Sequence, residues 1–222
     1  MKTLPLLALL AGCYAQATTR PGYYPTPTTD VEAAAPEAET EAEAPSPDDA
    51  TLPATPADDQ PKEYEDGQGT RVKLKLGDRA FADQVIAFQR GKRKAPAASQ
   101  NPRAALGRPD RRAHQDERLG TTLGCRGSLT VGFREIQIYD GPGPDLHIFE
   151  VGDDVEAMAI EVSADNKTWI AVGEVRGQPA SIDLAGQATG AYRFVRITDL
   201  ATACSSQWPG ADLDAVGAIN AR

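Results

Sequence analysis

The sequence predicts an all-β sandwich that follows a signal peptide and a long disordered linker. Short segments in which apolar and polar residues alternate recur from residue 72 to the C-terminus, and turn residues separate them. No long stretch has the 3.6-residue period of an amphipathic helix, which favours a sandwich over a mixed fold.

The first twelve residues have the layout of a secretory signal peptide. Met1-Lys2 gives a positive start, Leu4 to Leu10 an apolar run, and Ala11-Gly12 a small-residue cleavage site. The small pair directly before Cys13 resembles the lipobox of bacterial lipoproteins. That resemblance implies that residues 1–12 are removed and that Cys13 carries the lipid that anchors the protein to a membrane of the cell envelope, at the outer membrane or cell surface. The alternative is an ordinary secretory signal in which Cys13 has no such role.

Residues 13–68 form the predicted linker. Pro, Ala, Thr and Glu dominate it, and it contains too few aliphatic residues to bury a core, so we expect it to be disordered. The formal charge of the whole chain is −9. Because the acids concentrate in this linker, residues 69–222 are close to neutral. We interpret the linker as a spacer between the anchor and the folded domain.

The domain, residues 69–222, shows its predicted strands in a regular order. One basic, loop-like segment, residues 91–118, interrupts them and carries Pro96, Pro102 and Pro109. A hairpin turn is predicted at Asp165-Asn166, because both residues tolerate a positive φ. The predicted strands lie within residues 72–76, 81–88, 129–133, 146–151, 158–162, 169–175, 192–198 and 213–219.

Cys125 and Cys204 are the two cysteines left once Cys13 is assigned to lipid. An even remainder in an exported protein indicates a disulfide, worth about 4 kcal/mol for so long a loop on the chain-entropy model. Two buried free thiols are the alternative. Neither residue belongs to a Cys-x-x-Cys pair, which disfavours a redox or zinc site.

Two sets of stretches resemble known domains. In the first set, Val162 to Trp169 with Val172-Gly173 looks like a hairpin, and Tyr192 to Ile197 like a late strand, of galactose-binding-like (discoidin-like) jelly-roll domains. The second set resembles a family of bacterial cell-surface domains and comprises Ala105 to Asp110, Leu123 to Leu129, Asp140 to Glu150 and Gly210 to Val216. The resemblance implies a jelly-roll-like sandwich that binds a carbohydrate or a protein and often holds a structural calcium. It implies no catalytic residues.

A calcium site is predicted from five aspartates in turns and at a strand. Ca²⁺ takes six to eight oxygen ligands from carboxylates and carbonyls. Asp140 and Asp145 bracket a Gly-Pro-Gly-Pro turn, Asp212 and Asp214 are two apart on an extended segment, and Asp110 follows a turn. The alternative is that each Asp caps its own loop.

The ligand-binding candidates are Trp208, Arg111 and Arg112. Trp208 lies in a loop beside Cys204 and could stack on a sugar, although a core position fits it equally well. Arg111 and Arg112 belong to the basic segment, which could hold an anionic surface polymer or be a solvated loop. Nucleic acid is a poor partner for an exported domain without interleaved aromatic residues.

Catalysis has little support, because neither a Gly-x-Ser-x-Gly elbow nor a His-Glu-x-x-His motif occurs. His147 is interpreted as a strand residue, and Trp169 as a core residue. The sequence therefore predicts a lipid-anchored, non-catalytic module that binds a glycan or a cell-envelope protein. The rival hypotheses are a structural lipoprotein that docks a protein, and a hydrolase with two carboxylates about 5–10 Å apart in a cleft.

Overall fold

The computed structural model describes residues 60–93, 95–110, 120–152 and 155–222. All of them belong to one unit, Thr51–Arg222. Cys13, Arg111 and Arg112 lie outside the described residues, as do the signal peptide and most of the predicted linker. In the part of the chain that is described, no helix has the length and apolar character needed to cross a membrane.

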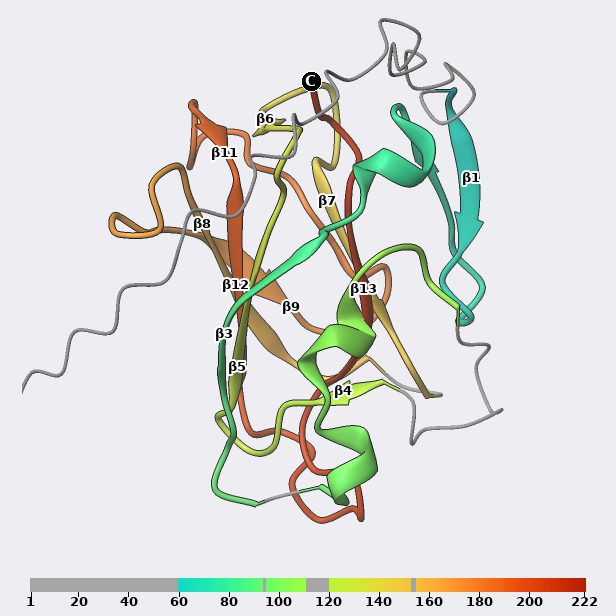
Figure 1. Cartoon of the computed structure of the whole chain (residues 1–222), viewed down its shortest axis with the longest axis vertical. Helices are drawn as coiled ribbons and strands as arrows, with labels where there is room; N and C mark the ends of the chain where they lie inside the picture. Colours follow the sequence, from blue (N-terminus) through green and yellow to red (C-terminus); the bar gives the residue numbers. More distant parts are fainter. Residues whose placement is uncertain (1–59, 94, 111–119, 153–154) are drawn as a thin grey trace, which may run out of the picture. The chain divides into compact units, whose positions relative to one another are not determined.

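The described residues form antiparallel strands joined by loops and three short 3-10 turns (Figure 1). The strands are β1 Lys62–Glu65, β2 Arg71–Leu74, β3 Gln84–Gln89, β4 Thr121–Thr122, β5 Ser128–Gly132, β6 Ile138–Tyr139, β7 Leu146–Glu150, β8 Met158–Ser163, β9 Ile170–Val175, β10 Ser181–Ile182, β11 Ala191–Tyr192, β12 Phe194–Asp199 and β13 Asp212–Ala218. The 3-10 turns are η2 Gly77–Ala80, η3 Ala97–Ser99 and η4 Pro102–Ala105.

Two sheets enclose the core. The larger has the strand order β3-β5-β12-β8-β9, and the smaller has the order β10-β7-β13-β4. Buried aliphatic side chains from both sheets meet in one cluster, among them Val131 and Ile197 of the larger sheet and Ile148 and Val216 of the smaller. The all-β sandwich is therefore confirmed, and each of the eight predicted strand segments contains a strand.

Strand β12 shows why the sequence pattern was informative. Val195 and Ile197 are fully buried, whereas Phe194 and Arg196, which alternate with them, are half-buried on the other face of the sheet. Successive side chains of a strand point to opposite faces, so this alternation places one row in the core and the other on the outside. The predicted turn is also confirmed, because Asn166 has a φ of 59°.

The fold begins before the predicted boundary at residue 69. Strand β1 lies inside the segment expected to be linker and pairs with β2. The Tyr64 ring packs edge-on against Phe81, with 4.8 Å between ring centroids, and Phe149 and Ala215 complete this second cluster. The hairpin thus covers the outer face of the smaller sheet. The Lys-Glu-Tyr-Glu sequence of β1 does not indicate a strand, because only one of its four residues is apolar.

The predicted disulfide is confirmed: Cys125 and Cys204 are bonded to each other, 79 residues apart in sequence. Side-chain contacts add to this connection. Arg93 Nη1 donates to the Cys204 carbonyl at 2.6 Å, and Trp208 Nε1 donates to Ser99 Oγ at 3.2 Å. The loop that contains Cys204 is therefore held against the segment that follows β3.

Candidate functional site

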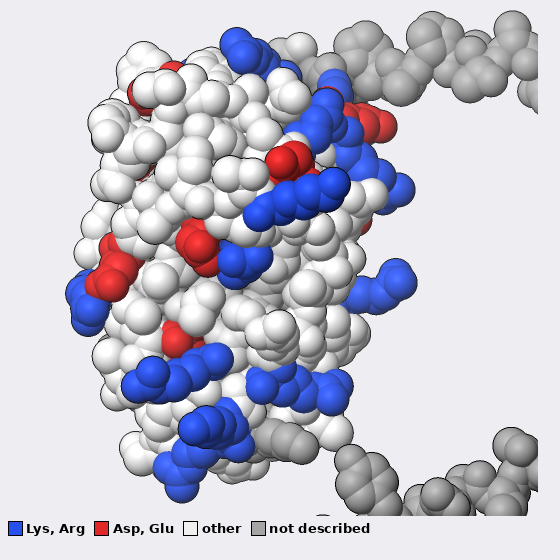
Figure 2. Space-filling model, turned by 90° about the vertical axis from the view of Figure 1, so that its left-hand side faces the viewer, with Lys and Arg blue, Asp and Glu red and all other residues white. Residues whose placement is uncertain are grey.

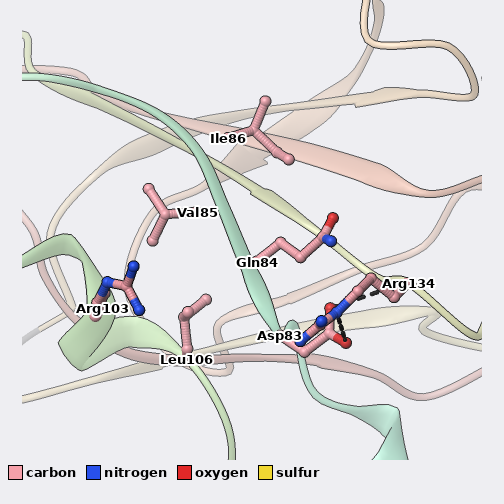
Figure 3. A pocket seen from close by; sticks show the side chains of 7 residues that line it. All are labelled: Asp83, Gln84, Val85, Ile86, Arg103, Leu106 and Arg134. Carbon is pink, nitrogen blue, oxygen red and sulfur yellow. Dashed lines mark hydrogen bonds and ion pairs between the residues drawn. The ribbon is translucent and has the colours of Figure 1, made fainter. Parts of the chain in front are cut away.

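A hollow of about 370 Å³ opens at the edge of the larger sheet (Figure 3). Strand β3, the turn η4 and the loop after β5 supply its lining. The lining combines charged and polar side chains with apolar ones. The lining residues are Asp83, Gln84, Val85, Ile86, Arg103, Leu106 and Arg134.

An irregularity in strand β3 shapes the hollow. β3 is an edge strand, and its register with β5 shifts between Val85 and Ala87, so Ile86 is the extra residue of a bulge. Bulges are common at sheet edges, where they redirect side chains. Val85 lies on the side of β3 that faces Arg103 and Leu106, whereas Ile86 lies on the other side with Gln84, so the lining of the hollow includes both sides of this edge strand (Figure 3).

Gly132 leaves room beside these side chains. It pairs with Gln84 on one side and with Phe194 on the other. A Cβ at this position would lie 3.2 Å from both Gln84 Oε1 and Ile86 Cδ1. Directly opposed residues of neighbouring strands lie about 5 Å apart. Phe194, half-buried on the outer face of the sheet, is therefore the aromatic residue next to this site.

Turn η4 positions Arg103. The Asn101 side chain caps the turn by accepting a hydrogen bond from the Arg103 backbone N–H at 3.1 Å, and Pro102 occupies the first position. Both features favour the start of a helical turn. The Gly107 N–H donates to the Ala82 carbonyl at 2.9 Å and connects the end of the turn to the start of β3.

An ion pair between Asp83 and Arg134 forms one wall of the hollow. Arg134 donates from its backbone N–H to Oδ1 at 3.1 Å and from Nε to Oδ2 at 2.9 Å. Both carboxylate oxygens of Asp83 are therefore engaged. The two side chains also line a second hollow of about 250 Å³, so the pair stands between the two spaces.

The second hollow is lined by charged groups that have partners. Asp78 accepts a hydrogen bond from the Tyr64 hydroxyl at 2.5 Å and pairs with Lys62. The hydrogen bond from Tyr64 lowers the pKa of the Asp78 carboxyl, and Lys62 acts in the same direction. Glu135 pairs with Arg79 at 3.5 Å.

Trp169 is not the core residue that the sequence suggested. It lies half-buried just before β9, and the Arg196 guanidinium stacks on its ring with 3.8 Å between the guanidinium carbon and the ring centroid. Arg196 also pairs with Glu161 at 3.2 Å. All three side chains lie on the outer face of the larger sheet, where a pairing cation makes a half-exposed indole favourable.

The structure brings together two of the five predicted calcium ligands. Asp140 and Asp145 each place a carboxylate oxygen within 4.8 Å of the other and of Asp183, a residue that the sequence analysis missed. Asp183 follows β10 by one residue, and that strand pairs with β7, which begins just after Asp145. This pairing was not visible in the sequence.

Asp145 already has an extensive structural role. Its side chain is completely buried and accepts hydrogen bonds from the Gly141 and Leu184 N–H groups and from Asn220 Nδ2, at 2.7–2.8 Å. Both of its oxygens are thus engaged by donors, and Asp140 and Asp183 are exposed. The three residues fit a calcium ion only in part, and calcium binding here stays a prediction.

The other predicted ligands do not join this cluster. Asp110 is exposed after η4. Asp212 and Asp214 are buried, and the register shift at Asp214 interrupts the alternation on which their shared face was predicted. Asp212 accepts a hydrogen bond from the Thr122 hydroxyl and donates its N–H to Glu150. Burial raises the pKa of the Glu150 carboxyl well above its usual range, and a hydrogen bond with Glu156 adds to this shift.

Of the predicted ligand-binding residues, only Trp208 can be placed. It is half-buried, its indole N–H is engaged by Ser99, and it lines neither hollow. The sequence analysis did not identify Gln84, Arg103 or Arg134, because no motif marks them and a bulge and a capped turn bring them together.

A Ser–His–Asp arrangement lies beneath the β1–β2 hairpin. His147 Nδ1 and Ser181 Oγ are 2.8 Å apart, and His147 Nε2 faces Asp66 Oδ2 at 3.7 Å. The His147 and Asp66 side chains are 0% and 1% exposed, so a substrate could not reach the imidazole. Burial lowers the pKa of His147 to about 4 despite the nearby Asp66 carboxylate. The expected strand position of His147 is confirmed.

Comparison of the chain with protein-family models and with curated proteins finds no match.

Proposed function

We propose that this protein is a non-catalytic module of the bacterial cell envelope that binds a glycan in the hollow between β3 and η4. The observation that carries the proposal is the mixed lining of that hollow. Two guanidinium groups and an amide, from Arg103, Arg134 and Gln84, line the hollow together with two apolar side chains, Val85 and Ile86, which stand on the two sides of β3 and are called here its apolar floor. Sugars present hydroxyl groups around a ring with apolar C–H faces, and this lining complements both.

The lining favours a glycan over a protein partner. A protein-docking surface needs a fully desolvated apolar centre, commonly built around aromatic anchors. Here the apolar side chains Val85, Ile86 and Leu106 are individually half-buried, and charged groups flank them. Such a surface suits a polar ligand that remains partly hydrated.

Three observations support a non-catalytic role. The Ser181–His147–Asp66 arrangement lies beneath the hairpin, out of contact with either hollow. Burial raises the pKa of the Glu150 carboxyl, as catalysis by a general acid would require. Glu150, however, does not line either hollow. The carboxylate in the first hollow, Asp83, is engaged by Arg134 through both oxygens.

We also propose that lipid on Cys13 anchors the protein and that the segment after it acts as a spacer. Mass spectrometry of the mature protein tests the anchor. An acylated N-terminal Cys13 is expected, and an unmodified Cys13 or a mature start at another residue would exclude it.

The binding proposal is tested on an array of bacterial surface glycans probed with the full-length chain. We expect a set of bound glycans and a loss of binding in Ile86→Ala, which removes part of the apolar floor. Ile170→Ala is the matched control, because Ile170 is also half-buried but lies on β9, the opposite edge strand. Equal binding by both variants, or no binding to any glycan by the unaltered chain, would contradict the proposal.

A further inference from the structure

The exposed surface of the domain is more basic than its composition suggests. Among the described residues no Lys or Arg is buried, whereas several carboxylates are withdrawn from solvent. Those buried acids are Asp66, Asp145, Glu150, Asp199, Asp212 and Asp214.

Hydrogen bonds within the protein occupy some of these buried carboxylates. Asp199, for example, accepts N–H bonds from Arg126, Ala201 and Ala211. These buried acids therefore contribute less negative charge to the accessible surface than the exposed bases contribute positive charge. Figure 2 shows the consequence on the side that faces left in Figure 1, where Lys and Arg side chains stand out and fewer Asp and Glu side chains lie between them.

The hollow itself has an excess of unneutralised guanidinium groups. Asp83 engages Arg134 through Nε and the backbone N–H, which leaves the terminal Nη groups of Arg134 without a partner among the described residues. The Arg103 side chain is exposed and likewise makes no ion pair within the described part of the chain.

A third arginine adds to this charge. Arg193 donates from Nη1 to the carbonyl groups of Phe133 and Arg134. These acceptors are neutral, so the positive charge of Arg193 stays uncompensated next to Arg134. Arg103 and Arg134 in the lining and Arg193 next to Arg134 thus supply three guanidinium groups, whereas the lining contains one carboxylate, Asp83.

The arrangement of the two lining arginines sets the ligand geometry. Arg103 stands at one end of the hollow and Arg134 at the other, with Val85 and Leu106 on the side of Arg103 (Figure 3). A guanidinium offers a planar fork of N–H donors that matches a carboxylate or a phosphate with two parallel hydrogen bonds. The apolar side chains beside Arg103 can contact the C–H face of a ring.

We infer that the ligand of this hollow is an acidic glycan, in which carboxylate or phosphate groups on the sugars bind the Arg103 guanidinium at one end of the hollow and the terminal nitrogens of Arg134 at the other. This inference rests on the proposed glycan-binding function and adds the chemical class of the ligand. Arg103 recognises the acidic group, and the apolar floor contacts the sugar ring, as it would in a neutral glycan.

The test compares acidic glycans with neutral counterparts of the same rings. The panel contains oligogalacturonate and its methyl ester, hyaluronan oligosaccharides and their carboxyl-reduced form, and phosphorylated and dephosphorylated lipopolysaccharide core. The dissociation constant of each is measured by calorimetry with the full-length protein. The variants are Arg103→Gln and, as a matched control, Arg176→Gln, which removes an exposed arginine near the end of β9.

We expect at least one acidic member to bind at least tenfold more tightly than its neutral counterpart. Arg103→Gln should weaken binding of that acid by about ten- to a hundredfold, the range for a lost hydrogen bond to a charged group. Arg176→Gln should leave the affinity unchanged. The uncharged counterpart should bind the unaltered chain and Arg103→Gln equally.

Two other outcomes separate the failures. Equal affinity for acidic and neutral members, unaffected by Arg103→Gln, would overturn this inference and leave the glycan-binding proposal standing. Absence of binding to every member, acidic or neutral, would overturn both. Equal weakening by Arg103→Gln and Arg176→Gln would show general charge attraction instead of recognition at the hollow, and would also overturn the inference.

Discussion

Asp83 and Arg134 are joined by two hydrogen bonds, one from the Arg134 backbone and one from its guanidinium, and the pair stands between the two hollows at the edge of the larger sheet. Asp83 directly precedes β3, and Arg134 follows β5, the strand that pairs with β3 in the sheet. The pair therefore fixes the loop that carries Arg134 and engages the Nε of its guanidinium.

Asp83→Asn should bring the full charge of Arg134 into the site. Both side chains are substantially exposed, so the free energy of unfolding should fall by only about 1 kcal/mol or less. Affinity for an acidic glycan should rise, because the competing carboxylate is removed. Calorimetry with oligogalacturonate and its methyl ester measures this change. An affinity that falls for the acid would contradict the account.

His147 should make the domain less stable as the pH falls from about 6.5 to 4. Burial lowers the pKa of His147 in the folded state to about 4, below the usual 6.5 of a histidine, so the unfolded chain binds more protons throughout that window. Stability therefore rises with pH across the window, and the contribution of about 3 kcal/mol is lost below it. Urea unfolding at several pH values measures the slope.

Replacement of His147 separates its contribution to the pH dependence of the free energy of unfolding from the contribution of the carboxyl groups. His147→Gln should flatten the pH dependence between 4 and 6.5, whereas His114→Gln, a change of the other histidine in the chain, should preserve it. A slope that His147→Gln leaves intact would show that other groups produce it.

Asp145→Asn should destabilise the domain by about 1–3 kcal/mol, because an amide keeps only one acceptor oxygen, so either the Leu184 N–H or the Gly141 N–H and Asn220 Nδ2 lose their acceptor. The exposed Asp140→Asn and Asp183→Asn should have small effects. The measurement is thermal unfolding with and without calcium. If calcium raises the melting temperature and each of the three substitutions removes that rise, Asp145 is primarily a metal ligand.

Loss of the disulfide should cost about 4 kcal/mol on the chain-entropy model, because Cys125 and Cys204 enclose 79 residues of sequence separation. Cys125→Ser, Cys204→Ser and the double variant should be destabilised equally in denaturant unfolding. Unchanged stability of the double variant would contradict a structural role for the bond.

The strands could be predicted from the sequence because their alternation reflects burial on one face. Val195 and Ile197 are in the core, and Arg196 between them is outside, as the pattern requires. Strand β1 was missed because it is stabilised by a tertiary contact, the packing of Tyr64 on Phe81. The charged residues around Tyr64 give no indication of that contact in the sequence.

The candidate site could not be predicted for a related reason. Ile86 lines the hollow because of a bulge, and Arg103 and Arg134 meet there only through the pairing of β3 with β5 and the packing of η4. Asp183 joins Asp140 and Asp145 through the pairing of β10 with β7. Residue type and spacing identified turns and charges, but the contacts between them depend on strand pairing.

The most direct test of glycan binding at this hollow is the amide spectrum of the full-length protein, recorded while an acidic glycan identified on the panel is added. The account predicts that the largest chemical-shift changes belong to Gln84, Ile86, Arg103 and Leu106. Changes concentrated at Trp208 or Trp169, with the lining of the hollow unaffected, would contradict it.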